Sequence, residues 1–158
     1  MAVKRSAGLL LFRRRSTDTE VLIGHMGGPF WEARDAAAWS VPKGEYTPEE
    51  EPMAAARREF EEELGLAPPE GEWAPLGEAR QPGGKIVTVW ALEGDLDTDL
   101  VVPGTFTMEW PMRSGRMQEF PEIDRAEWTG MDEARQKLVP GQHVFLDRLE
   151  ELLDTFQR

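Results

Sequence analysis

The chain has 158 residues, and its 30 acidic residues outnumber its 18 lysines and arginines, which gives a net charge of -12. This charge argues against DNA or RNA as a partner, because proteins usually bind the phosphate backbone through clustered lysines and arginines. The lack of cysteine excludes disulfides and thiolate metal sites and suits a reducing compartment. A chain of this length can bury roughly two thirds of its unfolded surface, so we expect one domain over residues 1–158.

The first predicted elements are two short strands rich in Leu, Val and Ile, at residues 6–12 and 20–25. The apolar run 7–12 is too short for the core of a signal peptide, and basic residues flank it. No stretch of the chain approaches the roughly 20 apolar residues that a bilayer span requires. We therefore expect a cytoplasmic protein that binds no membrane. Residues 26–38 contain Gly27, Gly28 and Pro29 and show neither helical nor strand periodicity, which predicts an irregular segment before extended chain at 39–42.

The clearest helix lies within GEYTPEEEPMAAARREFEEELGL, residues 44–66. Thr47 and Glu50 imitate a helix-capping box, but proline is favoured at the first position of a helix and disfavoured inside it. We therefore expect the helix to begin near Pro52. It should end at Gly65, since glycine is the usual residue just after a helix. The residues between Thr47 and Pro52 then form a turn.

The second half of the chain predicts more strands than helices. Strand-like segments follow at 73–80, 85–92, 105–110 and 123–129, the first two joined by a Pro-Gly-Gly turn. Residues 112–121 are polar and contain glycine, so we expect a loop there. Helical periodicity predicts a short helix at 131–138 and an amphipathic closing helix at 143–156. Because strands and helices do not alternate regularly, the pattern indicates an α/β or α+β domain with a mixed sheet.

Three glutamates lie on one face of the predicted helix. At about 100° per residue, Glu59, Glu62 and Glu63 share an arc beside the apolar arc that contains Phe60. Neighbours at this spacing lie about 5 to 6 Å apart, so ionised carboxylates there repel one another unless a cation lies between them. An all-oxygen cluster suits Mg²⁺, with Mn²⁺ as an alternative, and Arg58 can pair with Glu62 four residues later. The alternative is an ordinary solvated acidic face.

The order of residues in this stretch resembles the Nudix box. It reads Gly44, five residues, Glu50, seven residues, Arg58-Glu59-Phe60, one residue, Glu62-Glu63, one residue, Gly65-Leu66. The resemblance implies a Nudix-type α/β/α sandwich with a central mixed sheet, and a hydrolase that cleaves nucleoside diphosphates linked to another moiety.

The resemblance also implies roles for individual residues. Glu59, Glu62 and Glu63 match the metal-binding glutamates, and Arg58 matches the arginine that orients the carboxylates. Glu50 matches the box glutamate that supports the loop or an outer metal. The main-chain carbonyl of Lys43 stands where some members supply another metal oxygen.

Several members of the family bring a further glutamate from a later loop, six residues before a tryptophan. Glu122 stands six residues before Trp128, with Glu119 and Glu127 as nearby alternatives. A glutamate near a metal-activated water can act as general base. Glu59, Glu63 and Glu122 are all candidates, and the sequence does not choose among them.

The segment WSVPKGE at 39–45 is similar to the family branch that hydrolyses diadenosine polyphosphates. This implies a small nucleotide as partner, with a dinucleoside polyphosphate as the substrate. The side chains expected to contact it are Lys43, Arg113 and Arg116 at the phosphates and Phe30 and Trp31 at a base, with Lys85 a weaker choice. For each of them a solvated or packing role is the alternative.

The same residues are compatible with other functions. Nucleoside triphosphates and nucleotide sugars are alternative substrates of such a hydrolase. A Nudix-fold regulator that binds nucleotide without cleaving it is the non-enzymatic alternative, although no box glutamate is missing. We expect a monomer or a homodimer, because exposed edge strands in a short domain favour pairing.

Overall fold

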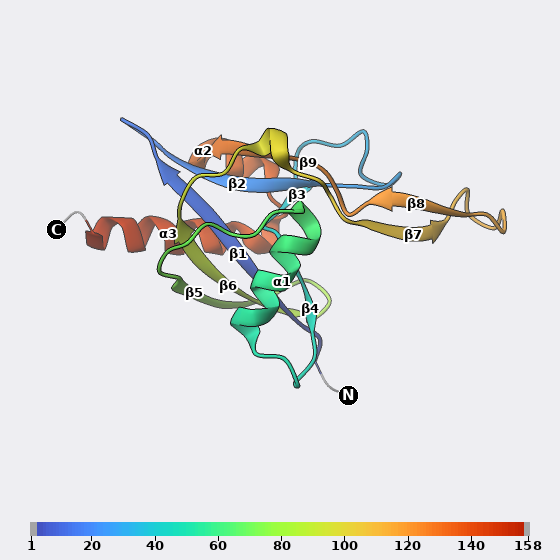
Figure 1. Ribbon diagram of the computed structural model, residues 1–158, viewed down its shortest axis with the longest axis horizontal. Helices are drawn as coiled ribbons and strands as arrows, with labels where there is room; N and C mark the ends of the chain where they lie inside the picture. Colours follow the sequence, from blue (N-terminus) through green and yellow to red (C-terminus); the bar gives the residue numbers. More distant parts are fainter. Residues whose placement is uncertain (1–2, 157–158) are drawn as a thin grey trace.

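The computed structural model describes residues 3–156 of the chain. Its nine strands, three α-helices and two short 3-10 helices are drawn in Figure 1. In chain order they are β1 (Arg5–Arg14), β2 (Thr19–Met26), β3 (Trp39–Ser40), β4 (Lys43–Tyr46), α1 (Pro52–Leu64), β5 (Ala74–Arg80), β6 (Ile86–Glu93), η1 (Thr98–Leu100), β7 (Thr105–Glu109), β8 (Met117–Pro121), β9 (Ile123–Gly130), α2 (Met131–Lys137), η2 (Pro140–Gln142) and α3 (His143–Phe156).

The central strand β1 organises a mixed sheet with the order β3-β2-β1-β6-β5. On one side β1 runs parallel to β6, from the pair Arg5 and Ile86 onward. On its other side, β1 pairs with two different strands, one along each half of its length. β2 pairs antiparallel with the end of β1 near Phe12, and β4 pairs antiparallel with its beginning near Gly8. The sheet therefore forks along β1, and β9 extends the β2 branch.

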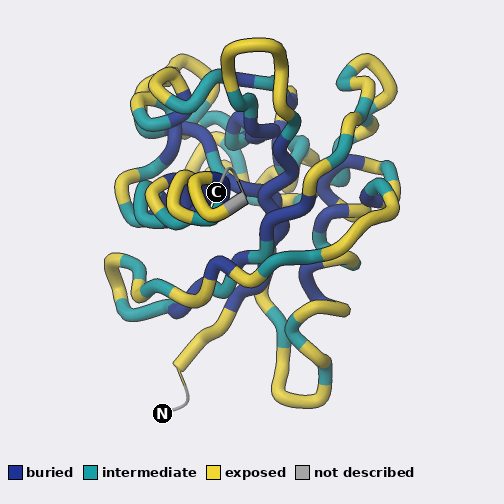
Figure 2. The backbone as a smooth tube through the Cα atoms, turned by 90° about the vertical axis from the view of Figure 1, so that its left-hand side faces the viewer, coloured by how far each residue is buried: buried dark blue, intermediate teal, exposed yellow. Residues whose placement is uncertain are grey.

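Helices cover both faces of this sheet (Figure 1). All seven residues from Ser6 to Phe12 are buried, and their side chains alternate between two apolar layers. Leu9 and Leu11 pack with Phe60 of α1, whereas Leu10 packs in the layer that contains α3. Figure 2 shows the buried residues gathered along the middle of the molecule, between exposed outer turns. This arrangement confirms the predicted α/β/α sandwich with a central mixed sheet.

Helix α1 begins and ends where the sequence predicts. Pro52 opens it, and Gly65 follows it in the left-handed conformation with φ of 72°, donating its N–H to Glu61 O at 2.8 Å. Glu50 donates its N–H to Thr47 O at 3.0 Å, so the segment before Pro52 is a turn, as expected. Complete burial of Phe60 contributes about 2 kcal/mol of hydrophobic stabilisation and presses the helix against the sheet.

Two strands depart from the predictions. The loop expected at 112–121 is wrong in its second half, because β8 pairs with β7 through Phe106 and Phe120 to form a separate hairpin. Its sequence MQEFP shows no alternation of polar and apolar residues, so only the partner strand reveals it. β4 is the other, a polar four-residue strand that pairing with β1 creates. The remaining strands and helices agree with the predictions to within a few residues. Within residues 3–156, no helix combines the length and apolar character needed to cross a bilayer.

Candidate active site

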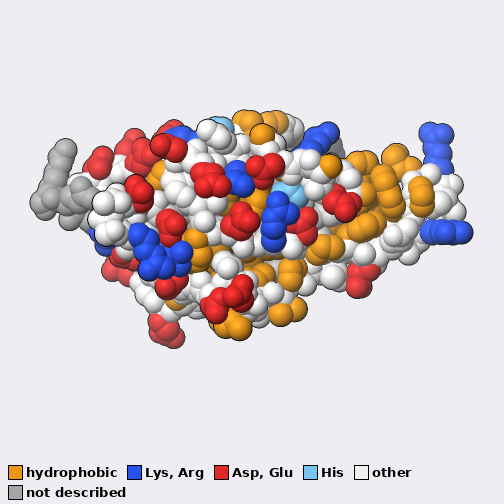
Figure 3. Space-filling model, turned by 90° about the horizontal axis from the view of Figure 1, so that it is seen from above, with side chains coloured by type: hydrophobic (Ala, Val, Ile, Leu, Met, Phe, Trp, Pro, Cys, Tyr) orange, Lys and Arg blue, Asp and Glu red, His pale blue; other side chains and the backbone are white. Residues whose placement is uncertain are grey.

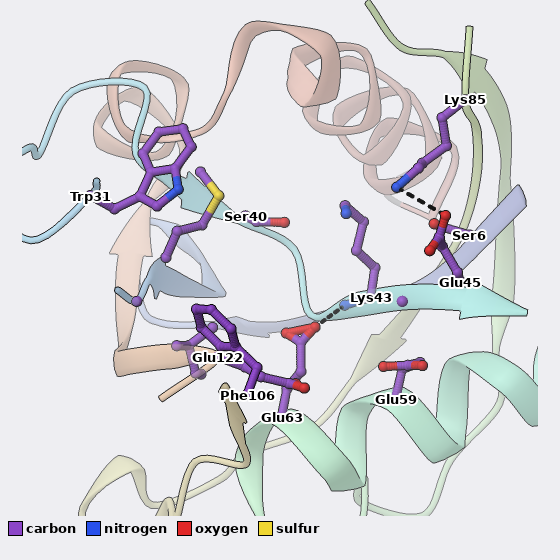
Figure 4. A pocket seen from close by; sticks show the side chains of 14 residues that line it. Ser6, Trp31, Ser40, Lys43, Glu45, Glu59, Glu63, Lys85, Phe106 and Glu122 are labelled. Atoms are coloured by element: carbon purple, nitrogen blue, oxygen red, sulfur yellow. Dashed lines mark hydrogen bonds and ion pairs between the residues drawn. The ribbon is translucent and has the colours of Figure 1, made fainter. Parts of the chain in front are cut away.

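A cavity of about 530 Å³ lies at the fork where β2 and β4 separate along β1 (Figure 4). Strands β1 to β4, helix α1, the β5–β6 turn, β7 and the β8–β9 junction all contribute to its wall. The lining residues are Ser6, Met26, Gly27, Trp31, Ser40, Lys43, Gly44, Glu45, Glu59, Glu63, Lys85, Phe106, Glu122 and Ile123. The fork thus gathers side chains that are far apart in the sequence.

Glu63 is the most buried carboxylate in this cavity, with 9% of the residue exposed. The main-chain N–H of Lys43 donates to Glu63 Oε1 at 3.0 Å and holds it toward β4. Burial raises the pKa of Glu63 to about 8, and the negative charges of Glu122 and Glu59 add to this effect, while Lys43 opposes it. A carboxylate held in this way favours a proton or a cation beside it.

Glu59 approaches β4 so closely that only glycine fits opposite it. A Cβ atom at Gly44 would lie 2.0 Å from Glu59 Cδ, which no real contact allows. The first glycine of the motif therefore makes room for the first glutamate of the helix. Burial raises the pKa of Glu59, against the lowering effect of the neighbouring Arg58.

Arg58 holds three carboxylates, of which Glu59 lines the cavity and Glu50 and Glu62 do not. Its Nε and Nη2 donate to Glu50 at 2.8 and 2.9 Å, and its Nη1 donates to Glu59 and Glu62 at 2.8 and 3.1 Å. The pairing with Glu62 is the one expected from the four-residue spacing. The hydrogen bonds from Arg58 lower the pKa of Glu50, which does not line the cavity. Glu50 thus fixes the guanidinium that positions Glu59 and Glu62.

Glu122 enters the cavity from the junction of β8 and β9, between two glycines. Gly27 donates its N–H to Glu122 O at 3.0 Å, and Glu122 donates its N–H to Gly104 O at 2.8 Å. Burial, followed by the charges of Glu59 and Glu62, raises the pKa of Glu122. The two alternatives considered from the sequence, Glu119 and Glu127, do not line the cavity.

Two lysines line the cavity along with the glutamates. Lys43 is partly buried, and burial lowers its pKa against the opposing attraction of Glu63. Lys85 Nζ lies 3.5 Å from Glu45 Oε1. The sequence analysis ranked Lys85 below Arg113 and Arg116, but Lys85 lines the cavity and the two arginines do not. The parallel pairing of β6 with β1 brings Lys85 beside the start of β1, and no local signal reveals this long-range register.

Arg113 and Arg116, which were expected at the phosphates, lie in the turn of the β7–β8 hairpin and do not line the cavity. Figure 3 shows basic side chains at the far end of the molecule, beyond a run of hydrophobic ones. Phe30 also lies outside the cavity, 53% exposed, with its ring 5.4 Å from that of Trp110. Trp31 does line the cavity. So does Phe106, which the sequence analysis did not single out.

The donor set fits a hard divalent cation. Among residues 3–156, no three Asp, Glu, His or Cys side chains converge closely enough to hold a metal ion in the arrangement described, because Glu59 and Glu62 turn toward Arg58. Even so, the carboxylates of Glu59, Glu63 and Glu122 face one cavity, and burial raises the pKa of each. Oxygen donors with excess negative charge suit Mg²⁺ or Mn²⁺.

The family model described as the NUDIX domain matches residues 3–149 of the chain. The chain belongs to the Nudix family. It is therefore a hydrolase that acts on pyrophosphate bonds, as the resemblance of its motif implied. No curated protein matches it in sequence.

Solved structures share the fold of this Nudix protein at low sequence identity. The binary complex of a C. elegans Ap4A hydrolase matches with a TM-score of 0.65 and 20% identity, over 97% of this chain and 99% of that one. A mutT/nudix family protein from Listeria innocua matches with a TM-score of 0.64 and 16% identity, over 99% of both chains. The NUDIX domain of Shewanella oneidensis NrtR, solved with ADP ribose, has a TM-score of 0.61 and 15% identity, over 97% and 90%.

Proposed function

We propose that this Nudix hydrolase requires Mg²⁺, with Mn²⁺ as a substitute, and cleaves the phosphoanhydride chain of a dinucleoside polyphosphate. The observation that carries the proposal is a single cavity lined by Glu59, Glu63 and Glu122 together with Lys43 and Lys85 (Figure 4). The carboxylates suit a divalent cation. The ammonium groups suit phosphates that extend beyond it, so the cavity is matched to a long anionic chain.

In this proposal Glu59, Glu62 and Glu63 hold the cation, with Glu122 and the main-chain carbonyl of Lys43 as further donors. Glu62 does not line the cavity, and its side chain, 52% exposed, would turn from Arg58 to reach the cation. A bound divalent cation neutralises phosphate oxygens and lowers the pKa of a water molecule. Arg58, itself fixed by Glu50, orients Glu59 and Glu62 for this role.

The proton of the attacking water goes to one of the carboxylates that line the cavity. Glu59, Glu63 and Glu122 are the candidates, because burial raises the pKa of each toward the value that suits a general base near neutral pH. A Glu→Gln substitution at the glutamate that acts as the base should remove the acidic limb of the pH–rate profile. A Glu→Gln substitution at a glutamate that only holds the cation should instead raise the cation concentration needed for the half-maximal rate.

The choice of a dinucleoside polyphosphate rests on the two lysines. A phosphate chain longer than a diphosphate places charge beyond the carboxylates, where Lys43 and Lys85 lie. The fold neighbours include a C. elegans Ap4A hydrolase, but also a domain solved with ADP ribose. Nucleoside triphosphates and nucleotide sugars are therefore the substrates to compare.

The test is hydrolysis of a panel containing dinucleoside polyphosphates, nucleoside triphosphates and nucleotide sugars, with product identification. Activity should appear with Mg²⁺ and disappear with a chelator. Glu62→Gln and Glu63→Gln should each lower turnover by about 10² or more, whereas Glu61→Gln, an exposed glutamate on the same helix, should leave it unchanged. Full turnover in both variants would refute the assigned roles, and tight nucleotide binding without turnover would identify a regulator instead.

A further inference from the structure

A second cavity of about 290 Å³ adjoins the first, and Met26, Ser40, Lys43 and Lys85 line both of them. We call it the second chamber. Its other lining residues come from the β5–β6 turn, from Val87 of β6, and from the segment 139–142 that precedes and forms η2. Because the two cavities share four residues, they are adjacent, and Lys43 and Lys85 border both of them.

The two cavities differ in charge. Four glutamates line the first cavity, at positions 45, 59, 63 and 122. None of the described residues that line the second chamber is acidic, although the chain has 30 acidic residues. Figure 4 shows the Lys43 side chain directed away from Glu63 and Glu59, toward the side where Ser40 and Lys85 lie. Lys43 and Lys85 therefore lie at the boundary between the two cavities, with the glutamates on one side and a region without acidic residues on the other.

The wall of the second chamber is mainly apolar and is held in place by hydrogen bonds. Pro82, Val139 and Pro140 supply apolar surface. Gln81 Nε2 donates to Gly141 O at 2.9 Å, which ties the β5–β6 turn to η2. Gln142 is 1% exposed, accepts the Val41 N–H and donates to Ser40 Oγ. The polar side chains of the wall are thus largely engaged with the protein, and the chamber offers shape and apolar contact.

We propose that the second chamber receives the second nucleoside of a dinucleoside polyphosphate, with Lys43 and Lys85 holding the phosphates between the two nucleosides. The proposal rests on the proposed function of the first cavity and adds a site to it. A substrate with one nucleoside ends at the lysines in a terminal phosphate and leaves the chamber empty. A neutral, flat base attached beyond the phosphates fits a largely apolar wall that has no acidic residue and whose two lysines, Lys43 and Lys85, lie on the side of the phosphates.

The test compares diadenosine tetraphosphate with adenosine 5′-tetraphosphate, which has the same phosphate chain but one nucleoside. In the wild-type protein, the KM for the diadenosine compound should be about tenfold lower, because contact with one more base strengthens binding by this order. Val139→Trp narrows the chamber and should abolish this difference without changing the KM for adenosine tetraphosphate. Pro82→Trp, on the exposed β5–β6 turn, fills the chamber from its other wall. It should also abolish the difference in KM, and it provides the test if the Val139→Trp variant does not fold.

The matched control is Leu100→Trp, which introduces the same side chain on η1, where Leu100 is 60% exposed and lines neither cavity. It should leave both KM values unchanged. Equal KM values in the wild-type protein, or equal effects of the chamber variants on both substrates, would overturn the second chamber while leaving the proposed function intact. If the folded protein with Mg²⁺ hydrolyses neither compound, both proposals fail together.

Discussion

The β4–α1 region and the β7–β8 hairpin both carry charged side chains, but they hold them in opposite ways. In the first region Glu63 is 9% exposed and Glu59 lies against Gly44. In the hairpin, Arg113 and Arg116 belong to a turn beside Met112 and Met117, which are 67% and 66% exposed. The hairpin forms its own two-stranded sheet and pairs with no strand of the main one.

This difference shows that burial, and not charge alone, distinguishes the candidate catalytic side chains from ordinary surface charges. Where helix and sheet press carboxylates together, burial changes their affinity for protons and cations, as the raised pKa values of Glu59 and Glu63 indicate. Charges on an exposed ribbon remain solvated, and their interactions contribute little. Substitutions in the first region should therefore have large effects, and those in the hairpin turn should have small ones.

The largest effect is expected from Gly44→Ala, because the added Cβ overlaps the Glu59 carboxylate. Displacing a catalytic group by about 1 Å can cost about 10² in rate, so turnover should fall by this order with the fold retained. The measurement is steady-state hydrolysis together with circular dichroism. Gly130→Ala is the matched control, since its Cβ would meet nothing within 4 Å. Similar losses in both variants would contradict the close packing of Glu59 on β4.

The next effect concerns stability without a divalent cation. Because burial raises the pKa of Glu63 from 4.5 to about 8, its protonated form is favoured in the fold, and this contribution is complete below about pH 4.5. It is lost as the pH rises to 8, so the free energy of unfolding should fall by about 3 kcal/mol between pH 5 and pH 8. The lowered pKa values of Glu50 and Glu93 add no slope there, since these groups are already ionised.

Urea denaturation at several pH values measures this dependence. Glu63→Gln should flatten it, and Mg²⁺ should restore stability most at high pH, because a cation binds the ionised carboxylates. A wild-type protein whose stability rises from pH 5 to pH 8 in a chelator would show that Glu63 is not held as described.

A smaller effect is expected from Arg58→Met, which removes the guanidinium that joins Glu50, Glu59 and Glu62. The glutamates of the helix then lose their orientation but remain in place, so turnover should fall by about tenfold, as for partners that orient metal ligands. The cation concentration for half-maximal rate should rise as well. Arg57→Met, one residue earlier and stacked over Trp73 instead, is the control and should behave like the wild-type protein.

The smallest effect is expected from the double variant Arg113→Ala and Arg116→Ala. Both residues lie in the hairpin turn and line neither cavity, so kcat and KM should change less than about twofold, as exposed charges contribute little. Lys85→Met, by contrast, should raise KM at least several-fold for a tetraphosphate substrate. If the arginine variant has the larger KM effect, the hairpin must fold toward the substrate, and the contrast between the two regions fails.

The sequence determined the features that depend on neighbours along the chain. The spacing of the motif, the start of α1 at Pro52 and its end at Gly65 follow from local backbone preferences and from the helical period. The same period predicted that Arg58 pairs with Glu62. Glu122 could be proposed because it stands at a fixed distance from Trp128, a pattern known from the family.

Only the tertiary structure decided which distant residues share the cavity. Lys85 joins it through the pairing of β6 with β1, which links residues some 80 positions apart, such as Arg5 and Ile86. Arg113 and Arg116 lie outside the cavity, in the turn of the hairpin that β8 forms by pairing with β7. A strand's local sequence sets its alternation, whereas its partner and register come from the whole core. The reaction class could therefore be inferred from one segment, and the shape available to the substrate could not.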